Sequence, residues 1–233
     1  MKTEKLFPEF EVEVQPHPTL DAAFWGVEHS RGNSDAVPDF LKWLSISEEI
    51  QQLTPFESLR DETLRDNVKS KVRDLLRHGG YKPTGRGKPA SEYLIKAVGN
   101  GKLGHINPVV DLINVVSLHS GLPISVVDIG KCDLQSKKLR VEIAPAETEY
   151  VFNASGQTIK LDGLLCLFDA MGPCGNAVKD SQRTKTSDTT EHSLVVIWGT
   201  QELPGQTQTA ATWFRELAES TGLICTDIKH TVS

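Results

Sequence analysis

The run from His105 to Asp128 limits the fold of this chain more than any other segment. Its sequence, HINPVVDLINVVSLHSGLPISVVD, is mostly apolar and reads as a helix that begins near Pro108. Gly121 and Pro123 are residues that end helices, and the apolar residues after them fit a buried strand. The segment therefore predicts a partly buried helix, a turn and a strand that border the main cleft.

Polar side chains interrupt this apolar run, and a buried carboxylate or amide costs free energy unless hydrogen bonds satisfy it. One interpretation is a hydrogen-bonded structural network, which the spacing alone favours. The other is the floor of a binding pocket. Both interpretations concern the same residues, which are His105, Asn107, Asp111, Asn114, His119, Ser125 and Asp128.

Hydrophobic periodicity elsewhere predicts an α/β (α+β) fold with a mixed sheet and flanking helices, in one domain that spans residues 1–233. We expect helices over 39–53, 57–77, 91–98 (capped by Ser91), 108–120 and 208–220. We expect strands over 10–14, 22–27, 125–127, 139–143, 149–152, 164–168, 194–198 and 223–228. The polar tract 179–191 predicts a loop or a partly ordered lid.

The loop YKPTGRGKPA, residues 81–90, contains three cations, Lys82, Arg86 and Lys88, and two glycines. Such a loop suits a close approach to phosphate, although a solvated turn explains it as well. It is not a P-loop, because Pro89 stands where a serine or threonine would bind magnesium.

Charge and cysteine usage exclude several classes of function. A net charge of −6 argues against a protein that coats nucleic acid nonspecifically, so no DNA partner is expected. The four cysteines have no CxxC spacing and the seven histidines no HExxH spacing, so neither a metal site nor a cofactor is expected. Nothing in the sequence specifies an oligomeric state.

The sequence shows no hydrophobic signal segment at its start, and no apolar run approaches the roughly 18 residues of a membrane span. The cysteines lie in apolar surroundings typical of reduced thiols. We therefore expect a cytoplasmic protein without a membrane partner.

The pattern IN-P-VVD-x-x-N-x-x-S-L-x-x-G-x-P-x-x-x-x-D within residues 106–128 resembles the signature of the B3/B4 domain. This domain is the editing module of the phenylalanyl-tRNA synthetase β subunit and also occurs as a freestanding protein. The resemblance continues upstream through Lys88–Leu94 and downstream through Asp162 and Gly163 towards Asp180, whereas residues 1–80 are less recognisable. It implies an editing domain that acts alone and binds mischarged tRNA.

The resemblance carries Asn114 over as a substrate contact, because the matching asparagine lines the editing pocket of the synthetase domain. Asp111, Asp180 and His105 join Asn114 as catalytic candidates, since hydrolysis of an activated ester needs mainly a positioned water and donors for the oxyanion. No GxSxG elbow and no local Cys–His pair indicates a covalent nucleophile.

Two departures from the family pattern bear on specificity. Ser125 replaces a histidine, and Asp180-Ser181 replaces a glutamate in a glycine-rich turn. We expect Asn107, Ser125, Asp169 and Ser181 to contact the substrate, with carboxylates at Asp169 and Asp180 favouring a polar or cationic side chain. Canavanine on the arginine tRNA, a specialisation of freestanding relatives, fits this expectation.

Three functions follow from these observations. The leading hypothesis is an aminoacyl-tRNA deacylase that removes, in trans, errors that a synthetase pocket cannot reject. The second is a noncatalytic tRNA- or RNA-binding module of the same fold. The third is a small-molecule hydrolase on this scaffold.

Overall fold

The computed structural model describes residues 7–29, 42–135 and 137–233. Within these residues the helices are α1 (Glu48–Leu53), α2 (Glu62–Arg77), α3 (Ala90–Gly99), α4 (Pro108–Ser120) and α5 (Gln206–Ser220). The strands are β1 (Glu11–Val14), β2 (Leu20–Glu28), β3 (Ile124–Asp128), β4 (Lys138–Ile143), β5 (Glu149–Val151), β6 (Thr158–Lys160), β7 (Leu165–Asp169), β8 (Gly172–Asn176), β9 (His192–Thr200), β10 (Ile224–Asp227) and β11 (His230–Val232). Short 3-10 turns lie at Gly85–Gly87, Ile129–Lys131 and Gln182–Thr184.

The strands form two main sheets and one hairpin. The four-stranded sheet has the order β10-β2-β9-β3 and is antiparallel throughout. The five-stranded sheet has the order β11-β1-β4-β7-β8 and is mixed, because β1 pairs in parallel with both β11 and β4. The α/β fold class with a mixed sheet is thereby confirmed.

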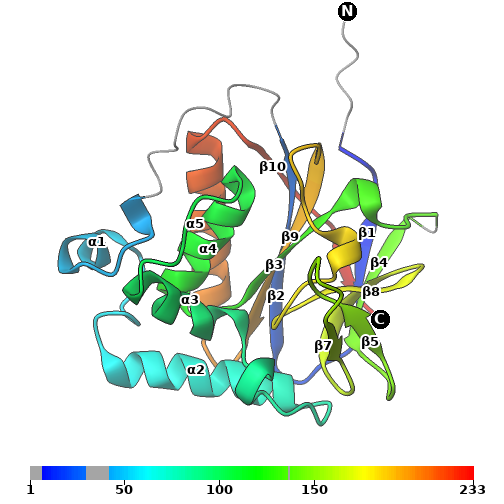
Figure 1. Cartoon of the computed structure of the whole chain (residues 1–233), viewed down its shortest axis with the longest axis horizontal. Coiled ribbons are helices and arrows are strands. Elements are labelled where there is room, and N and C mark those ends of the chain that lie inside the picture. Colours follow the sequence, from blue (N-terminus) through cyan, green and yellow to red (C-terminus); the bar gives the residue numbers. More distant parts are fainter. Residues whose placement is uncertain (1–6, 30–41, 136) are drawn as a thin grey trace, which may run out of the picture.

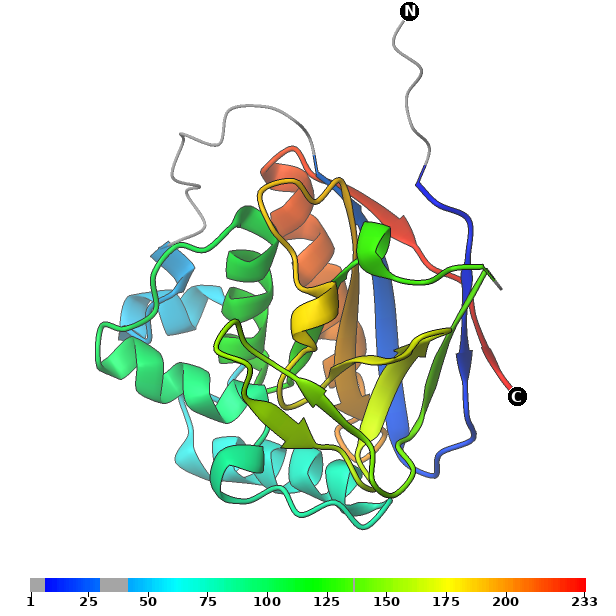
Figure 2. The same ribbon diagram turned by 45° about the vertical axis from the view of Figure 1, so that its right-hand side comes forward.

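The molecule has three layers, with helices, then the four-stranded sheet, then the five-stranded sheet (Figure 1; Figure 2). The middle sheet has a core on each face. One core contains Leu194, Val196 and Trp198 of β9 together with strands of the outer sheet. The other contains Val195 and Ile197 of β9 together with α4 and α5.

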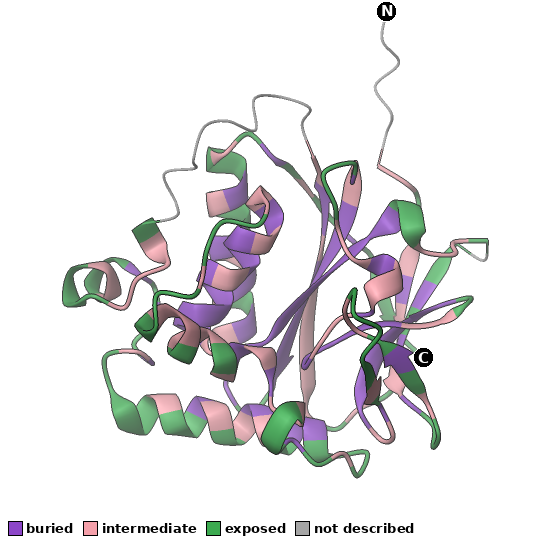
Figure 3. Ribbon diagram, in the orientation of Figure 1, coloured by how far each residue is buried: buried purple, intermediate pink, exposed green. Residues whose placement is uncertain are grey.

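Burial on both faces explains the continuous apolar run of β9, HSLVVIWGT, which has no polar alternation. The same holds for β3, all five residues of which are buried. Figure 3 shows the buried sides of α4 and α5 turned toward this sheet, while much of α2 is exposed. Residues Leu75 and Leu76 near the end of α2 enter the core between the sheets.

The helix–turn–strand prediction for residues 105–128 is confirmed. Helix α4 ends at Gly121, which adopts a left-handed conformation at φ +72°. A Cβ atom there would lie 2.8 Å from Val68 Cγ1, so this glycine also lets α4 approach α2 closely.

Other expectations were wrong in detail. Residues 45–47 are not helical, and the helix expected over 39–53 begins at Glu48 with Ser47 as its cap; residues 39–41 lie outside the described residues. Ser91 does not cap α3 but lies buried within it, after Pro89 at the cap position. Strands β6, β8 and β11 were not expected; β8 has the sequence GPCGN, which lacks a strand pattern.

Among the described residues, no helix has the length and apolar character needed to cross a membrane.

Candidate functional site

The first turn of α4 carries the first group of candidate residues. Asn107 caps the helix by accepting a 3.0 Å hydrogen bond from the backbone N–H of Val110. Its amide also donates to Thr186 Oγ1 at 3.2 Å, which attaches the loop 179–191 to the start of α4. Asn107 was expected to contact the substrate, but its side-chain oxygen and its side-chain nitrogen are both hydrogen-bonded within the protein.

His105 and Asp111 form a hydrogen-bonded pair beside this cap. The Asp111 carboxylate is fully buried, accepts the backbone N–H of Ile106 at 3.0 Å and accepts a bond from His105 Nδ1. The His105 side chain is 43% exposed. Because an ionised carboxylate only accepts, it fixes the Nδ1 proton and leaves Nε2 of a neutral imidazole as an outward proton acceptor.

Asn114 lies one helical turn after Asp111 and therefore on the same side of α4. It is partly exposed. No hydrogen bond of its side chain is found among the described residues, in contrast to Asn107. Its amide is therefore able to donate to a ligand.

A second group of candidates lies between β3 and β8. The buried Ser125 hydroxyl donates to the carbonyl of Asn176 at 2.8 Å and accepts from Trp198 Nε1 at 2.8 Å. Asn176 in turn donates through its amide to the Tyr150 hydroxyl, which donates to the carbonyl of Lys179. Ser125 is thus part of a closed hydrogen-bonded network rather than an open pocket wall.

Asp180 contacts this network from the segment that follows β8. Its carboxylate accepts the backbone N–H groups of Val126 and Asn176, each at 3.2 Å. Removal from water raises the pKa of Asp180 to about 6, although the adjacent Ser125 hydroxyl, the two backbone N–H groups and the charge of Lys185 oppose that rise. A carboxyl group that titrates near neutrality is suited to acid–base chemistry.

Gly175 makes the close approach of β3 and Asp180 sterically feasible. A Cβ atom on Gly175 would lie 3.1 Å from Asp180 Oδ1 and 3.3 Å from Val127 Cγ1. The glycine of β8 therefore permits the contact between the two layers at this network.

The segment after Asp180 connects the two groups. Ser181 caps the 3-10 turn Gln182–Thr184, and Thr184 donates to the carbonyl of Cys174 at 2.9 Å. Six residues after Asp180, Thr186 contacts Asn107, and the chain between Asp180 and Thr186 spans at most about 22 Å. The tract 179–191 is a loop as expected, but one whose Ser181, Thr184 and Thr190 are buried.

Asp169 belongs to neither group. Its buried carboxylate accepts two bonds from the Arg183 guanidinium, at 2.7 and 2.9 Å, and two more from the backbone N–H groups of Asp133 and Met171. The expectation that Asp169 faces a substrate guanidinium therefore has no support here, because a guanidinium of the same chain occupies the carboxylate.

The basic loop is placed as expected at the surface. Lys82 and Arg86 are exposed and Lys88 is partly exposed, and within the described residues none of the three forms an ion pair. The neighbouring Lys179 lies over the Phe152 ring at 3.9 Å. Partial burial, then the charges of Arg86 and Lys185, lower the pKa of Lys179. Lys185 also contacts Phe152, because its Nζ donates to the Phe152 carbonyl at 2.6 Å.

The residues that sequence reasoning missed are those that complete these contacts: Tyr150, Trp198, Asn176, Arg183, Lys179 and Lys185. The only signal for them was their position in or beside the polar tract 179–191 and the apolar strands. No cluster of three His, Cys, Asp or Glu side chains suited to a metal ion occurs in the described part of the chain.

Two cavities lie near α4, and the segment 105–128 borders one of them. That cavity, of about 240 Å³, is lined by Leu118 and Gly121 from this segment, whereas the other, of about 380 Å³, lies between the start of α5 and the residues before α2. Neither is lined by Asn114, His105 or Asp180. The segment thus contributes apolar rather than polar residues to a cavity.

Comparison with known proteins agrees with this architecture. No curated protein sequence matches the chain. Among solved structures, an N-terminal fragment of the phenylalanyl-tRNA synthetase β subunit from Pyrococcus horikoshii is similar, with a TM-score of 0.53 and 10% identity. The match covers 97% of this chain and 53% of that one, so the chain spans about half of the fragment, and the likeness concerns the fold. The model of the B3/4 domain family matches residues 82–208, more than half of the chain, and the chain therefore belongs to the B3/4 domain family.

Proposed function

We propose that this chain is a tRNA-binding enzyme that hydrolyses, in trans, the ester of mischarged aminoacyl-tRNA. The observation that carries the proposal is the pairing of the half-exposed His105 imidazole with the buried carboxylate of Asp111. Family membership and the fold shared with a synthetase fragment supply the substrate class.

His105 would act as the general base. Its Nε2 takes a proton from a water molecule as the water oxygen bonds to the ester carbonyl carbon. Asp111 holds the ring in place and stabilises the imidazolium that forms. The bond from that carbon to the ribose oxygen then breaks, and the proton passes from Nε2 to the leaving oxygen.

Asn114 would stabilise the oxyanion of this reaction. Its amide has no partner among the described residues and lies one turn from Asp111. A donor aimed at the developing charge is worth about 10²–10³-fold in rate where it is fully preorganised. Asp180, with its pKa raised to about 6, is the alternative proton acceptor.

The basic loop would bind the phosphates of the acceptor end of the tRNA. Lys82, Arg86 and Lys88 extend from one short segment, and Lys179 and Lys185 both contact Phe152. Clustered cations without ion-pair partners suit a phosphate backbone.

For the substrate side chain we retain a polar or cationic group, with canavanine on the arginine tRNA as the first candidate. This choice rests on the family resemblance alone, because Asp169 is already paired with Arg183 and the Ser125 hydroxyl is bonded to Asn176 and Trp198. The decisive comparison is hydrolysis of canavanyl-, arginyl- and tyrosyl-tRNA by one preparation. Preference for tyrosyl-tRNA would overturn the specificity and leave the deacylase proposal standing.

A deacylation screen with cognate and near-cognate aminoacyl-tRNAs tests the activity itself. Hydrolysis above the spontaneous rate, lost in His105→Ala, supports the proposal. If Asp180 is the base instead, Asp180→Asn removes the rise of kcat/KM near pH 6 while His105→Ala keeps it.

A second candidate function is a noncatalytic tRNA-binding module. The closed network of Ser125, Trp198 and Asn176 favours it, because the Ser125 hydroxyl is bonded within the protein and Ser125 lines neither of the two cavities described above. Binding of tRNA without hydrolysis of any charged species in the screen would establish this alternative.

A further inference from the structure

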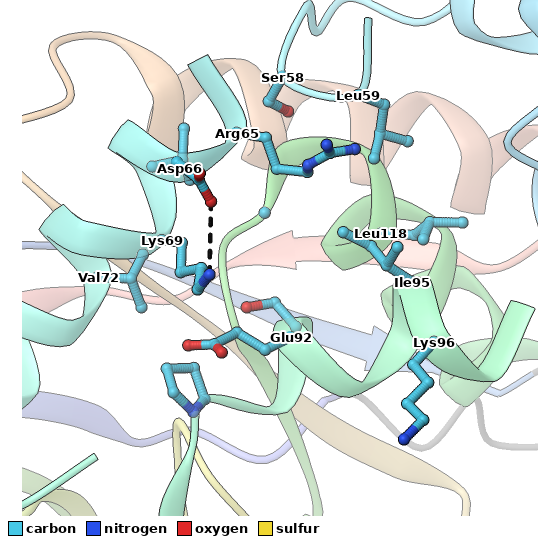
Figure 4. Close-up of a pocket in the computed structure, with 14 residues that line it drawn as sticks. Ser58, Leu59, Arg65, Asp66, Lys69, Val72, Glu92, Ile95, Lys96 and Leu118 are labelled. Atoms are coloured by element: carbon cyan, nitrogen blue, oxygen red, sulfur yellow. Dashed lines mark hydrogen bonds and ion pairs between the residues drawn. The ribbon is translucent and has the colours of Figure 1, made fainter. Parts of the chain in front are cut away.

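A cavity of about 240 Å³ lies between α2, α3 and the end of α4 (Figure 4), and no candidate catalytic residue lines it. Its lining comes from residues 58 and 59, one side of α2, the start of α3, and the last turn of α4. None of these residues has a role in the function proposed above.

The walls of the cavity are largely apolar. Val68 and Val72 come from one side of α2, Ile95 from α3, Leu118 from α4 and Leu59 from the preceding segment. At about 30 Å³ for each water-sized group, the volume holds a chain of about eight such groups. An apolar cavity of this kind gains free energy when an apolar ligand displaces water from it.

Cations lie at the opening of the cavity. Figure 4 shows the guanidinium of Arg65 beside Leu59, and Lys69 next to Asp66; all four residues line the cavity. The ion pair of Arg65 is weak, since its nearest carboxylate oxygen, on the largely exposed Glu62, is 3.8 Å away. The Lys69–Asp66 pair is closer, at 3.4 Å.

The acidic residues at the opening are neutralised within the protein. Glu92 accepts two hydrogen bonds of 2.6 Å from Arg73, an arrangement that uses both carboxylate oxygens. On the same helix Lys96 lines the cavity and has no ion-pair partner among the described residues. The rim therefore carries Lys96, which has no ion-pair partner among the described residues, and Arg65, whose ion pair with the exposed Glu62 is long at 3.8 Å.

From this arrangement we infer a binding site for a small amphipathic anion, with its apolar chain in the cavity and its anionic head group on Arg65. A medium-chain carboxylate is the simplest member of this ligand class. A cation with the same apolar chain would meet the positive rim and bind more weakly. The inference is independent of the deacylase proposal, because none of the lining residues belongs to the candidate catalytic set.

Isothermal titration calorimetry of the full chain with octanoate and with octylamine tests the site. Octanoate is expected to bind, and octylamine to bind at least about 10-fold more weakly. Arg65→Glu should weaken octanoate binding at least about 10-fold. Lys160→Glu makes the same charge change at an exposed position of β6 and should leave octanoate binding unchanged.

Filling the cavity provides the second test. Ile95→Trp should abolish octanoate binding, while Ile224→Trp, at an exposed position of β10, should not. Circular dichroism checks the folding of each variant, and Leu59→Trp is the substitute if Ile95→Trp does not fold. Absence of octanoate binding to the wild type, equal binding of octylamine, or full binding by a folded cavity-filled variant would each overturn the inference.

Discussion

The indole N–H of Trp198 donates a 2.8 Å hydrogen bond to the hydroxyl of Ser125, and both side chains are buried between the two sheets. The Ser125 hydroxyl in turn donates a hydrogen bond to the carbonyl of Asn176 on β8. One hydroxyl therefore satisfies two buried polar groups on two different strands.

Ser125→Ala should consequently lower the free energy of unfolding by about 1–3 kcal/mol, because it leaves the Trp198 N–H and the Asn176 carbonyl without a partner. Chemical denaturation measures the change. Ser70→Ala, at an exposed position of α2, serves as the control and should stay within about 0.5 kcal/mol of the wild type. Equal stability of the two variants would mean that water replaces the Ser125 hydroxyl.

The Asp169–Arg183 pair should matter structurally rather than for substrate binding. Arg183→Ala leaves a buried carboxylate with only its two backbone donors, and the free energy of unfolding should fall by about 3–5 kcal/mol. Arg140→Ala breaks an exposed 3.4 Å pair with Glu142 and should cost at most about 1 kcal/mol. If the Arg183→Ala variant is stable and its substrate preference changes, Asp169 contacts the substrate after all.

His119 should make stability depend on pH. Its Nε2 donates to the carbonyl of Trp43 at 2.8 Å, its Nδ1 has no partner among the described residues, and the rings of Trp43 and Trp213 lie against it. Burial lowers the pKa of His119 below its usual 6.5, so the unfolded chain binds the proton more readily than the folded chain. Stability from this group is therefore present above about pH 6.5 and is lost as the pH falls below it.

His119→Gln keeps a donor for Trp43 but does not titrate. Between about pH 7.5 and about pH 5, the melting temperature of the wild type should fall more than that of the variant. Removal from water also lowers the pKa of His17, to about 4, and that of His29. Both histidines remain in the variant, so only the difference between the two curves reports on His119. Parallel curves would show that His119 does not protonate on unfolding.

His105 and Asn114 should affect turnover in different degrees. Loss of a general base in His105→Ala should reduce kcat at least about 100-fold, and loss of one oxyanion donor in Asn114→Ala about 10-fold or more. Single-turnover deacylation measures both. His230→Ala, at an exposed position of β11, is the control and should be fully active. Unchanged turnover in a folded Asn114→Ala variant would remove Asn114 from the mechanism.

The basic loop should set the salt dependence of tRNA binding. Replacing Lys82, Arg86 and Lys88 by alanine should weaken binding and reduce the slope of log K against log salt by up to about 2–3, as expected for three lost phosphate contacts. Filter binding over a range of salt concentrations measures the slope.

A matched variant with three exposed cations changed elsewhere separates local contacts from net charge. Lys102, Lys160 and Lys229 form no ion pair among the described residues, and their replacement by alanine gives the same net charge as the loop variant. This variant should keep the wild-type slope. Equal slopes in all three proteins would exclude the loop from the tRNA interface.

The sequence alone determined the elements whose signals are local. The helix–turn–strand of residues 108–128 followed from an apolar run, Gly121 as the helix stop and the apolar residues after it. The buried strand β9 followed from continuous apolar residues, and the family signature lies within residues 106–128, the same segment as the helix–turn–strand. Each signal depends on neighbours within a few positions, and the fold class could be predicted from their order.

Tertiary structure alone decided what the polar side chains contact. Asp169, Asp180 and Asp111 are equivalent carboxylates in the sequence, yet Arg183 pairs with the first, backbone N–H groups hold the second, and His105 binds the third. Strand β8, with its weak pattern, forms because β7 pairs with it. The partner of a buried polar group comes from a distant part of the chain, so packing of whole layers, and not local spacing, fixes which residues can form a site.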